Sequence, residues 1–328
     1  LEAVLEILEE DGDPLGKLTL ETRRNLASAF MSNGDLDRAA SLLEETLEET
    51  RSIFGSESTE AFRTLSMLAD VETSRGNHEL AIEMYKEALA GIQSSHGPDS
   101  SLTSDVKGDL ARAYGRNGDL ELAKNLYQDV LKADIAWGGK DSLPMSVTRG
   151  LLGAIELALG EVDASIASME RSMEVLIPEL GYEHATTSYI LGQLAAAYDQ
   201  AGDSAATLEL MRGLVESWID EAEDPGTGAF RVNQIARWLL TVDVVELRDP
   251  ERSISLAQRS IEIAENAEET DIYLFGYHDT HAMALFRSGS FDEAVKAQRL
   301  AIEMAPDGID TSDLESRLDE YVAATEKD

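Results

Sequence analysis

Two short segments carry residue types whose spacing could support chemistry. His278 and His281 lie three residues apart in an expected helix, and imidazoles are common ligands of zinc. A zinc site needs further ligands, and His281 stands at a position where the repeat described below has a packing leucine. We therefore expect both histidines to be structural or polar groove residues. Residues 138–142 (Gly-Gly-Lys-Asp-Ser) share part of a phosphate-loop pattern but lack its leading glycine and preceding strand.

Other catalytic patterns are missing from the sequence. Paired glutamates such as Glu44-Glu45 and Glu48-Glu49 are expected to form solvated helix faces, because acid/base dyads need a cleft that shifts their pKa values. There is no G-x-S-x-G and no kinase glycine-rich loop, H-R-D or D-F-G. The chain has no cysteine, which excludes disulfides and thiolate chemistry. We expect no enzyme activity, no cofactor and no metal here, and any catalytic domain would lie elsewhere in a parent protein.

The charge of the chain restricts its partners. Its 328 residues include 64 acidic and 27 basic side chains, for a net charge of −37. Binding to phosphate backbones or anionic membranes needs a basic face, so we expect neither nucleic acid nor membrane as a partner. The absence of cysteine, of a signal peptide and of a long apolar run favours the cytoplasm. The chain begins at Leu1, so we expect a piece of a longer protein.

Glycines recur with a fixed period, which indicates an internal repeat. Two series advance by 42 residues at each step: Gly34, Gly76, Gly118, Gly160 and Gly202, and then Gly55, Gly97, Gly139 and Gly181. Glycine tolerates the positive φ that ends a helix, so the two series mark two turns of one repeating unit.

Two amphipathic segments lie between these turns. The first carries Leu26, Ala27 and Phe30 on one helical face, and the second carries Ala39 and Leu43. The small residues let two helices approach closely while the larger residues fill the space between them. Polar residues after the first glycine are expected to cap the second helix: Asp35, Asn77, Asp119 and Asp203.

The pattern of these residues resembles the tetratricopeptide repeat. The turns at 53–58, 95–100, 137–142 and 179–184 are similar to the L-G-x-[DE]-H-P turn of kinesin light chain repeats, which are also 42 residues long. The resemblance implies an all-α, right-handed superhelical solenoid of antiparallel helix pairs. Segments 247–252, 277–280 and 284–289 are further similar to the tetratricopeptide tails of bacterial serine/threonine protein kinases.

We expect the whole chain, residues 1–328, to form a single solenoid that the period divides into repeats. Residues 1–12 are predicted to be the second helix of a truncated repeat, and 311–326 a C-terminal capping helix with the polar outer face that an array needs. The predicted repeats are 19–54, 59–96, 102–138, 144–180, 184–223, 229–268 and 273–306.

In this family the first helices of successive repeats line a concave groove. The predicted first helices sum to a net charge of +1, so nearly all of the negative charge lies elsewhere. We expect a near-neutral, arginine-bearing groove for an acidic or amphipathic peptide, although these arginines could equally balance neighbouring acids. The outward positions of the first helices are Arg24, Ser28, Arg63, Met67, Asp70, Asp109, Arg112, Arg116, Tyr189, Gln193, Gln200, Asn233 and Arg237.

Two functions from different classes remain open at this stage. The first is a non-catalytic scaffold that binds an extended or helical segment of a protein in the groove, as a module of a larger signalling protein such as a serine/threonine kinase. The alternative is a peptide-gated regulatory domain that changes its superhelical pitch on binding. The sequence does not determine the partner or the oligomeric state.

Overall fold

The protein is entirely helical in the parts that the computed structural model describes. These parts are residues 16–136, 142–242, 244–266, 273–306 and 308–326, and none of their residues lies in a strand. The predicted all-α solenoid is confirmed. The predicted helix at residues 1–12 lies outside the described residues.

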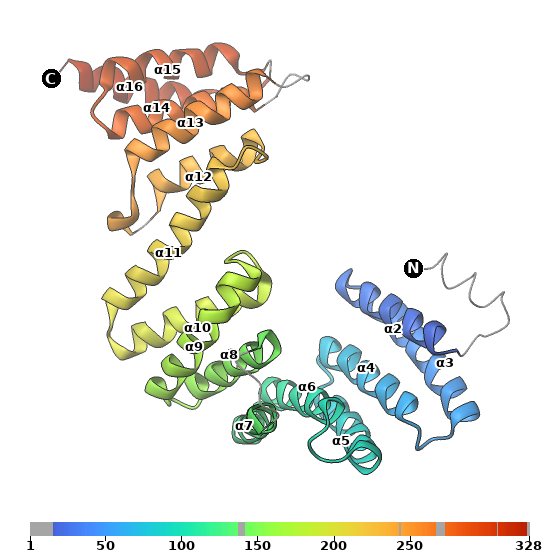
Figure 1. Cartoon of the computed structure of the whole chain (residues 1–328). Coiled ribbons are helices and arrows are strands. Elements are labelled where there is room, and N and C mark those ends of the chain that lie inside the picture. Colours follow the sequence, from blue (N-terminus) through green and yellow to red (C-terminus); the bar gives the residue numbers. More distant parts are fainter. Residues whose placement is uncertain (1–15, 137–141, 243, 267–272, 307, 327–328) are drawn as a thin grey trace. The chain divides into compact units, whose positions relative to one another are not determined.

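The helices follow one another along the chain with short connections (Figure 1). In order they are α2 (Lys17–Ser32), α3 (Leu36–Phe54), α4 (Thr59–Arg75), α5 (His78–His96), α6 (Ser101–Asn117), α7 (Leu120–Ala136), α8 (Leu143–Ala158), α9 (Val162–Leu180), α10 (Ala185–Ala201), α11 (Ser204–Glu223), α12 (Ala229–Thr241), the 3₁₀ turn η1 (Val245–Leu247), α13 (Pro250–Glu265), α14 (Leu274–Arg287), α15 (Phe291–Met304) and α16 (Ser312–Thr325).

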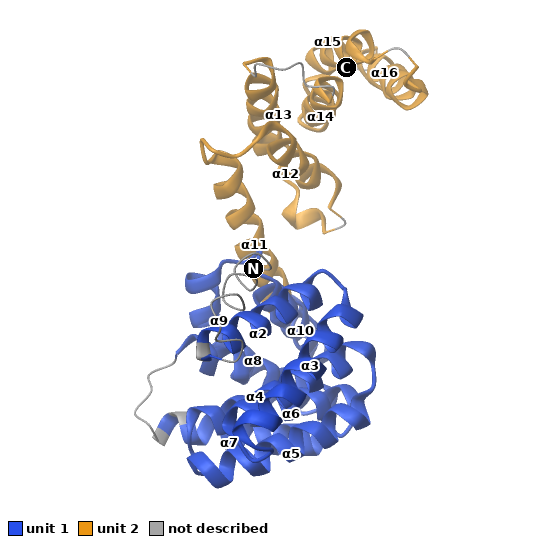
Figure 2. Ribbon diagram, turned by 90° about the vertical axis from the view of Figure 1, so that its right-hand side faces the viewer, with its two compact units in different colours: residues 1–204 blue, residues 205–328 orange. Residues whose placement is uncertain are grey.

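The chain divides into two compact units, residues 1–204 and 205–328 (Figure 2). In unit 1 each helix packs on the next, and α4 also contacts α2 and α6. In unit 2 α12 packs on α13, α14 on α15 and α15 on α16, while α12 also contacts α14. The boundary between the units falls within the range 184–223 that the period assigns to one repeat.

Serine caps the start of three first helices at the same register. The hydroxyls of Ser58, Ser100 and Ser142 accept hydrogen bonds from the backbone N–H groups of Ala61, Thr103 and Met145, at 3.3, 3.2 and 3.4 Å. Each bond satisfies one N–H that the first turn of a helix leaves unpaired. A cap thus recurs with the same 42-residue period as the glycines.

The second helices are capped less regularly than predicted. The carboxylate of Asp35 accepts a hydrogen bond from Arg38 N at 3.3 Å, as expected. Asn77 makes no such cap; its side-chain amide instead donates to Glu72 Oε2 at 2.7 Å. The charged carboxylate of Glu72 is a strong acceptor for this amide, and the hydrogen bond ties the start of α5 to the last turn of α4.

The two glycine series adopt two different conformations. Gly76 ends α4 in the left-handed helical region with φ 85° and ψ 8°, whereas Gly55 ends α3 with φ 91° and ψ 156°. Both φ values lie where other residues are strained, which explains why glycine recurs at both turns.

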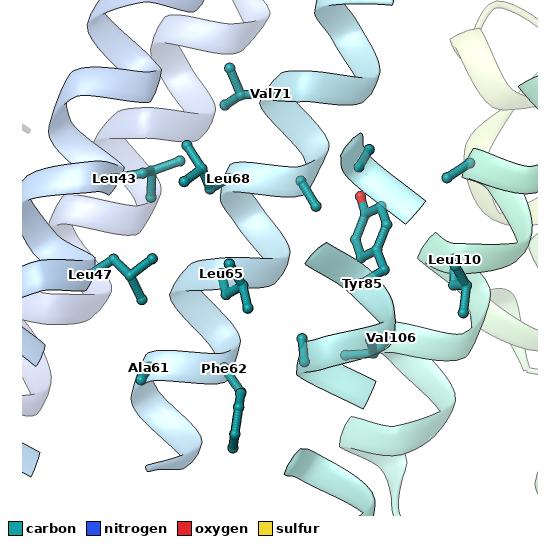
Figure 3. Packing of buried hydrophobic residues seen from close by; sticks show 14 of the residues in the cluster. Leu43, Leu47, Ala61, Phe62, Leu65, Leu68, Val71, Tyr85, Val106 and Leu110 are labelled. Carbon is teal, nitrogen blue, oxygen red and sulfur yellow. The ribbon is translucent and has the colours of Figure 1, made fainter. Parts of the chain in front are cut away.

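Small and branched apolar residues form the core between successive helices. In unit 1, Leu43 of α3 lies beside Leu68 of α4, and Tyr85 of α5 lies between α4 and α6 (Figure 3). Leu43 and Tyr85 are fully buried. Each buried side chain of this size stabilises the fold by roughly 1.5–3 kcal/mol. Among the described helices, none is long and apolar enough to cross a membrane.

Candidate functional site

Two adjoining cavities follow the first helices of unit 1. The α2–α6 cavity has a volume of about 360 Å³ and is lined by Glu21, Arg24, Asn25, Arg63, Ser66, Met67, Ile92, Leu102, Asp105, Val106 and Asp109. The α6–α8 cavity, of about 470 Å³, shares Asp105 and Asp109 with it and continues across α6 and α7 to α8. We call the two cavities together the unit 1 groove.

The structure brings several predicted groove residues together here. Arg24, Arg63, Met67 and Asp109 line the α2–α6 cavity, and Asp109 and Arg112 line the α6–α8 cavity. They come from α2, α4 and α6, and α4 contacts both α2 and α6. A groove that spans successive first helices suits an extended or helical segment of another chain better than a compact small molecule.

Arg24 is the most deeply buried charged residue of the α2–α6 cavity. Only 5% of its surface is exposed, and its Nη1 donates to Glu60 Oε2 at 2.9 Å. Glu60 also lies 3.8 Å from Arg63 through its other carboxylate oxygen. Burial lowers the pKa of Arg24, and the neighbouring charge of Glu60 opposes that effect. Nη2 of Arg24 is buried and has no hydrogen-bond partner.

A network centred on Arg112 joins the two cavities to the core. Its Nη2 lies 2.7 Å from Asp70 and 2.8 Å from Asp109, and the hydroxyl of Tyr85 donates to Asp70 at 2.7 Å. Burial raises the pKa of Asp109 to about 6, against the attraction of Arg112. One guanidinium therefore serves two carboxylates, which leaves this wall of the groove with excess negative charge.

The remaining predicted residues are not among those that line the unit 1 groove. Ser28, Arg116, Tyr189 and Gln200 are exposed, and Gln193 is half-buried. Asn233 and Arg237 belong to α12 in unit 2.

The arginines of the unit 1 groove lie beside carboxylates. The first helices do carry arginines, but Arg24, Arg63 and Arg112 each face a carboxylate within 4 Å. The sequence left two roles open for these arginines, the binding of a partner and the balancing of neighbouring acids. All three arginines are placed to balance a neighbouring acid. Of these three arginines, Arg24 alone has a buried nitrogen without a hydrogen-bond partner among the described residues.

Comparison with known proteins identifies the family. Tetratricopeptide-repeat family models match residues 18–94, 60–136 and 277–307. Residues 18–136 and 277–307 of the chain thus belong to the tetratricopeptide-repeat family. No curated protein matches its sequence.

Three solved structures are similar to this tetratricopeptide-repeat chain. One, from Podosopora anserina, is described as a kinesin light chain with nearly identical TPR-like repeats; it is 20% identical over 62% of this chain and 97% of its own, with a TM-score of 0.53. The apo form of RapI is 11% identical over 87% and 97%, with a TM-score of 0.52. The apo form of the quorum sensor NprR from B. thuringiensis is 15% identical over 92% and 83%, with a TM-score of 0.50. At these identities the likeness concerns the fold.

The acidic side of the tetratricopeptide groove was missed from the sequence. Asp99 and Asp105 line the α6–α8 cavity, and Asp105 also faces the α2–α6 cavity. Asp105 and Asp109 are four residues apart and so share one face of α6, which is the signal that could have revealed them. Glu60, which holds Arg24, was also missed because it lies at the start of α4, outside the central positions that the repeat pattern selects.

Unit 2 holds two further cavities. One has a volume of about 390 Å³, and its lining includes Trp218, Trp238 and the predicted groove residue Arg237. The other, of about 630 Å³, is lined by side chains of α13, α14 and α15, including His278 and His281. Burial lowers the pKa of both histidines. No cluster of three or more possible metal ligands occurs among the described residues.

Proposed function

We propose that this tetratricopeptide-repeat chain is a non-catalytic module that binds a segment of another protein in the unit 1 groove. The observation that carries the proposal is the continuity of the two cavities, which share Asp105 and Asp109 and extend from α2 to α8. Charged and apolar side chains line the α2–α6 cavity together, since Met67, Leu102 and Val106 lie among its charged groups. Such a lining suits an amphipathic peptide.

The proposed contacts fall into two groups. Arg24, Arg63, Met67, Asp109 and Arg112 line the groove itself, while Ser28, Asp70 and Arg116 lie on the same first helices. We further propose separate contacts on α10 and α12, and these are Tyr189, Gln193, Gln200, Asn233 and Arg237.

The parent protein that we propose is a cytoplasmic signalling protein such as a serine/threonine kinase. The similarity of residues 247–252, 277–280 and 284–289 to the tails of bacterial kinases supports this context. Expression of the complete coding region would test it, because a kinase domain would appear in the same polypeptide.

A peptide selection tests the binding function. The chain is immobilised, a randomised short-peptide library is passed over it, and retained peptides are sequenced and measured by fluorescence anisotropy. Gly108 lies on α6 in the α6–α8 cavity, and a Cβ added there meets no atom within 4 Å. Gly108→Trp should therefore fold and fill the cavity, and we expect it to weaken binding at least tenfold.

The matched control for this variant lies on α14. Gly276 is a half-buried helical glycine that, like Gly108, has open space at its Cβ, and it lines neither cavity of the groove. Gly276→Trp should leave the affinity of the selected peptides unchanged. Failure to enrich any peptide, or equal losses in the two variants, would contradict the proposal.

A second candidate function is peptide-gated regulation. The ion pair between Asp70 on α4 and Arg112 on α6 depends on the spacing of successive helix pairs, so a change of pitch would break or remake it. The fold that the chain shares with the apo quorum sensor NprR supports this candidate. Small-angle scattering with a selected peptide distinguishes the two: an altered radius of gyration indicates a sensor, and an unchanged one a scaffold.

A further inference from the structure

The largest of the four described cavities lies in unit 2, between the second helices α13 and α15. Its volume is about 630 Å³, and side chains of α14, which packs on both of these helices, complete its lining. We call it the α13–α15 cavity. Cavities of about 300–1,000 Å³ are typical of sites that bind small molecules. This cavity shares no lining residue with the unit 1 groove, so it can take a different kind of ligand.

The turn between first and second helix relates this place to its counterpart in unit 1. Gly118 follows α6 and Gly289 follows α14, both with positive φ. At each turn the N–H of the residue after the glycine donates to a carbonyl of the preceding helix, that of Tyr114 in α6 and that of Leu285 in α14, at 2.9 Å in both. Residues of α14 and α15 therefore correspond to those that stand 171 positions earlier in α6 and α7.

Larger side chains occupy the corresponding space in unit 1. Tyr114 and Leu126 stand there, and both pack against the core of that unit. In unit 2 these positions hold Leu285 and Ala297, which line the α13–α15 cavity. A smaller side chain at a packed position leaves empty volume unless the neighbouring helices close in. The cavity thus lies where unit 1 places an aromatic ring and a longer aliphatic side chain.

A cation accompanies this ring in unit 1. The ammonium group of Lys86 on α5 lies 5.6 Å from the centre of the Tyr114 ring, which is a cation–π contact. Asn77 and Asp249 are the N-cap residues of α5 and α13, so the residue that corresponds to Lys86 is Gln258. Gln258 lines the α13–α15 cavity and carries no charge. Unit 2 therefore lacks both the ring and the cation at this place.

The cavity also carries two carboxylates that its counterpart does not have. Glu262 and Glu293 line the cavity, at positions where unit 1 has Ala90 and Leu122. Both glutamates are exposed, and neither forms an ion pair with another described residue. Their charges are thus available to a ligand.

The balance of charge in the lining favours a cation. Lys296 is the only lysine or arginine that lines the cavity, against the two carboxylates. Burial lowers the pKa of His278 and His281, so both imidazoles are neutral near pH 7 and do not repel a positive group. The net charge of −37 attracts cations to the chain as a whole.

We propose that the α13–α15 cavity binds a small aromatic amine. The ring of this ligand occupies the space that Tyr114 fills in unit 1, and its ammonium group lies beside Glu262 and Glu293. The ligand supplies the ring and the cation that unit 2 lacks at this place. It would bind in addition to the peptide proposed for the unit 1 groove, and in a different unit of the chain.

Tyramine is the probe, because it joins a phenol ring to a primary ammonium group. It is titrated into the whole chain by isothermal titration calorimetry, beside p-cresol, which has the ring without a charge, and para-hydroxyphenylacetate, which has the ring with a carboxylate. We expect saturable binding of tyramine, several-fold weaker binding of p-cresol and the weakest binding of the anion. No saturable binding of tyramine up to about 10 mM, or tighter binding of the anion, would overturn the proposal.

Two variants fill the cavity. Ala297→Leu and, separately, Leu285→Tyr give unit 2 the side chains that unit 1 has at these positions, and each should weaken tyramine binding about tenfold or more without lowering the melting temperature. Ala323→Leu is the matched control, since Ala323 is an exposed alanine of α16 outside the cavity. Unchanged affinity in both filled variants would place tyramine elsewhere and contradict the proposal.

The carboxylates are tested with the charged and the uncharged ligand. Glu262→Gln and Glu293→Gln should each weaken tyramine binding several-fold and leave p-cresol binding unchanged, because only tyramine carries the ammonium group. Glu303 is an exposed residue of α15 outside the cavity, and Glu303→Gln should change neither affinity. An equal loss of tyramine binding in Glu303→Gln would assign the effect to the overall charge of the chain and overturn the placement of the ammonium group.

Discussion

The guanidinium of Arg112 lies 2.7 Å from the carboxylate of Asp70, and these two residues stand 42 positions apart on α4 and α6. In unit 2, Arg237 of α12 contacts Asp279 of α14 at 3.3 Å, again across 42 positions. The period of the sequence is therefore expressed in charge as well as in packing. In these two cases, equivalent positions of neighbouring first helices carry opposite charges, which ties one helix pair to the next.

Loss of Arg112 should destabilise unit 1. Arg112→Met removes the shared cation of Asp70 and Asp109, and we expect the free energy of unfolding to fall by about 1–2 kcal/mol, the range for partly exposed charge-assisted hydrogen bonds. Arg116→Met on the exposed part of the same helix should change it by less than about 0.5 kcal/mol. Urea unfolding followed by circular dichroism measures both, and equal effects would show that the network adds nothing.

Asp109 gives the stability a specific pH dependence. Its pKa is raised to about 6 by burial, so the folded chain holds a proton there that the unfolded chain releases between about pH 4 and pH 6. This group therefore adds stability as the pH falls through 6. The stability of the original chain relative to Asp109→Asn should grow by on the order of 1 kcal/mol between about pH 7 and pH 5. Urea titrations at each pH measure the difference, and a flat or shrinking one contradicts the assignment.

Two glycines at equivalent positions should respond in opposite ways to alanine. A Cβ at Gly150 of α8 would lie 2.3 Å from Ile190 and 2.7 Å from Ser172, whereas a Cβ at Gly192 of α10 meets no atom within 4 Å. Gly150→Ala should lower the free energy of unfolding by about 1–3 kcal/mol through overpacking.

Gly192→Ala should raise it by about 0.5–1 kcal/mol, because alanine is the better helix former. Thermal melts of both variants, in parallel, measure the contrast. Changes of the same sign would show that the helices can separate to accept the methyl group.

Asp279 should be essential to unit 2. This carboxylate is only 2% exposed and accepts hydrogen bonds from Arg237, Gln298 and Arg317, so it joins α14 to α12, α15 and α16. Asp279→Ala leaves these donors without their acceptor and should cost about 3–5 kcal/mol.

Hydrogen exchange locates the effect of this change. Protection of the amides in α14–α16 should fall, while protection in α4–α6 stays as it was. The exposed Asp319 of α16 supplies the control, because Asp319→Ala removes an equal charge from the same unit without a buried contact. Loss of protection in both variants would assign the effect to charge alone.

The fold was predictable because its determinants are local and periodic. Gly153 stands three periods after Ala27, at the small-residue position of the repeat, and it lets α8 and α9 approach closely: a Cβ there would lie 2.5 Å from Met169 and 3.1 Å from the carbonyl oxygen of Ser165. The glycine turns likewise follow from backbone conformations that few other residues adopt. The division at residue 204 was not foreseen, although the two glycine series end close to it, at Gly202 and Gly181.

The candidate site was predictable only in part. The repeat pattern selects outward positions on first helices, and that was sufficient to find Arg24, Arg63 and Arg112. It does not select their partners. Glu60 reaches Arg24 across 36 residues, and such a contact depends on the angle and offset between two helices. Those quantities come from three-dimensional packing, which a one-dimensional pattern does not specify.

The 42-residue ion pairs also determine which neighbours each repeat will accept. The register that holds Asp70 and Arg112 is occupied by Ser28 in the preceding helix pair and by Ala154 and Ala196 in the following ones. Deleting the helix pair that carries Asp70 would therefore place Arg112 opposite Ser28. Duplicating that helix pair would place two aspartates side by side. The repeats share one shape but are not interchangeable, so the array has a fixed internal order that recombination between its own copies would break.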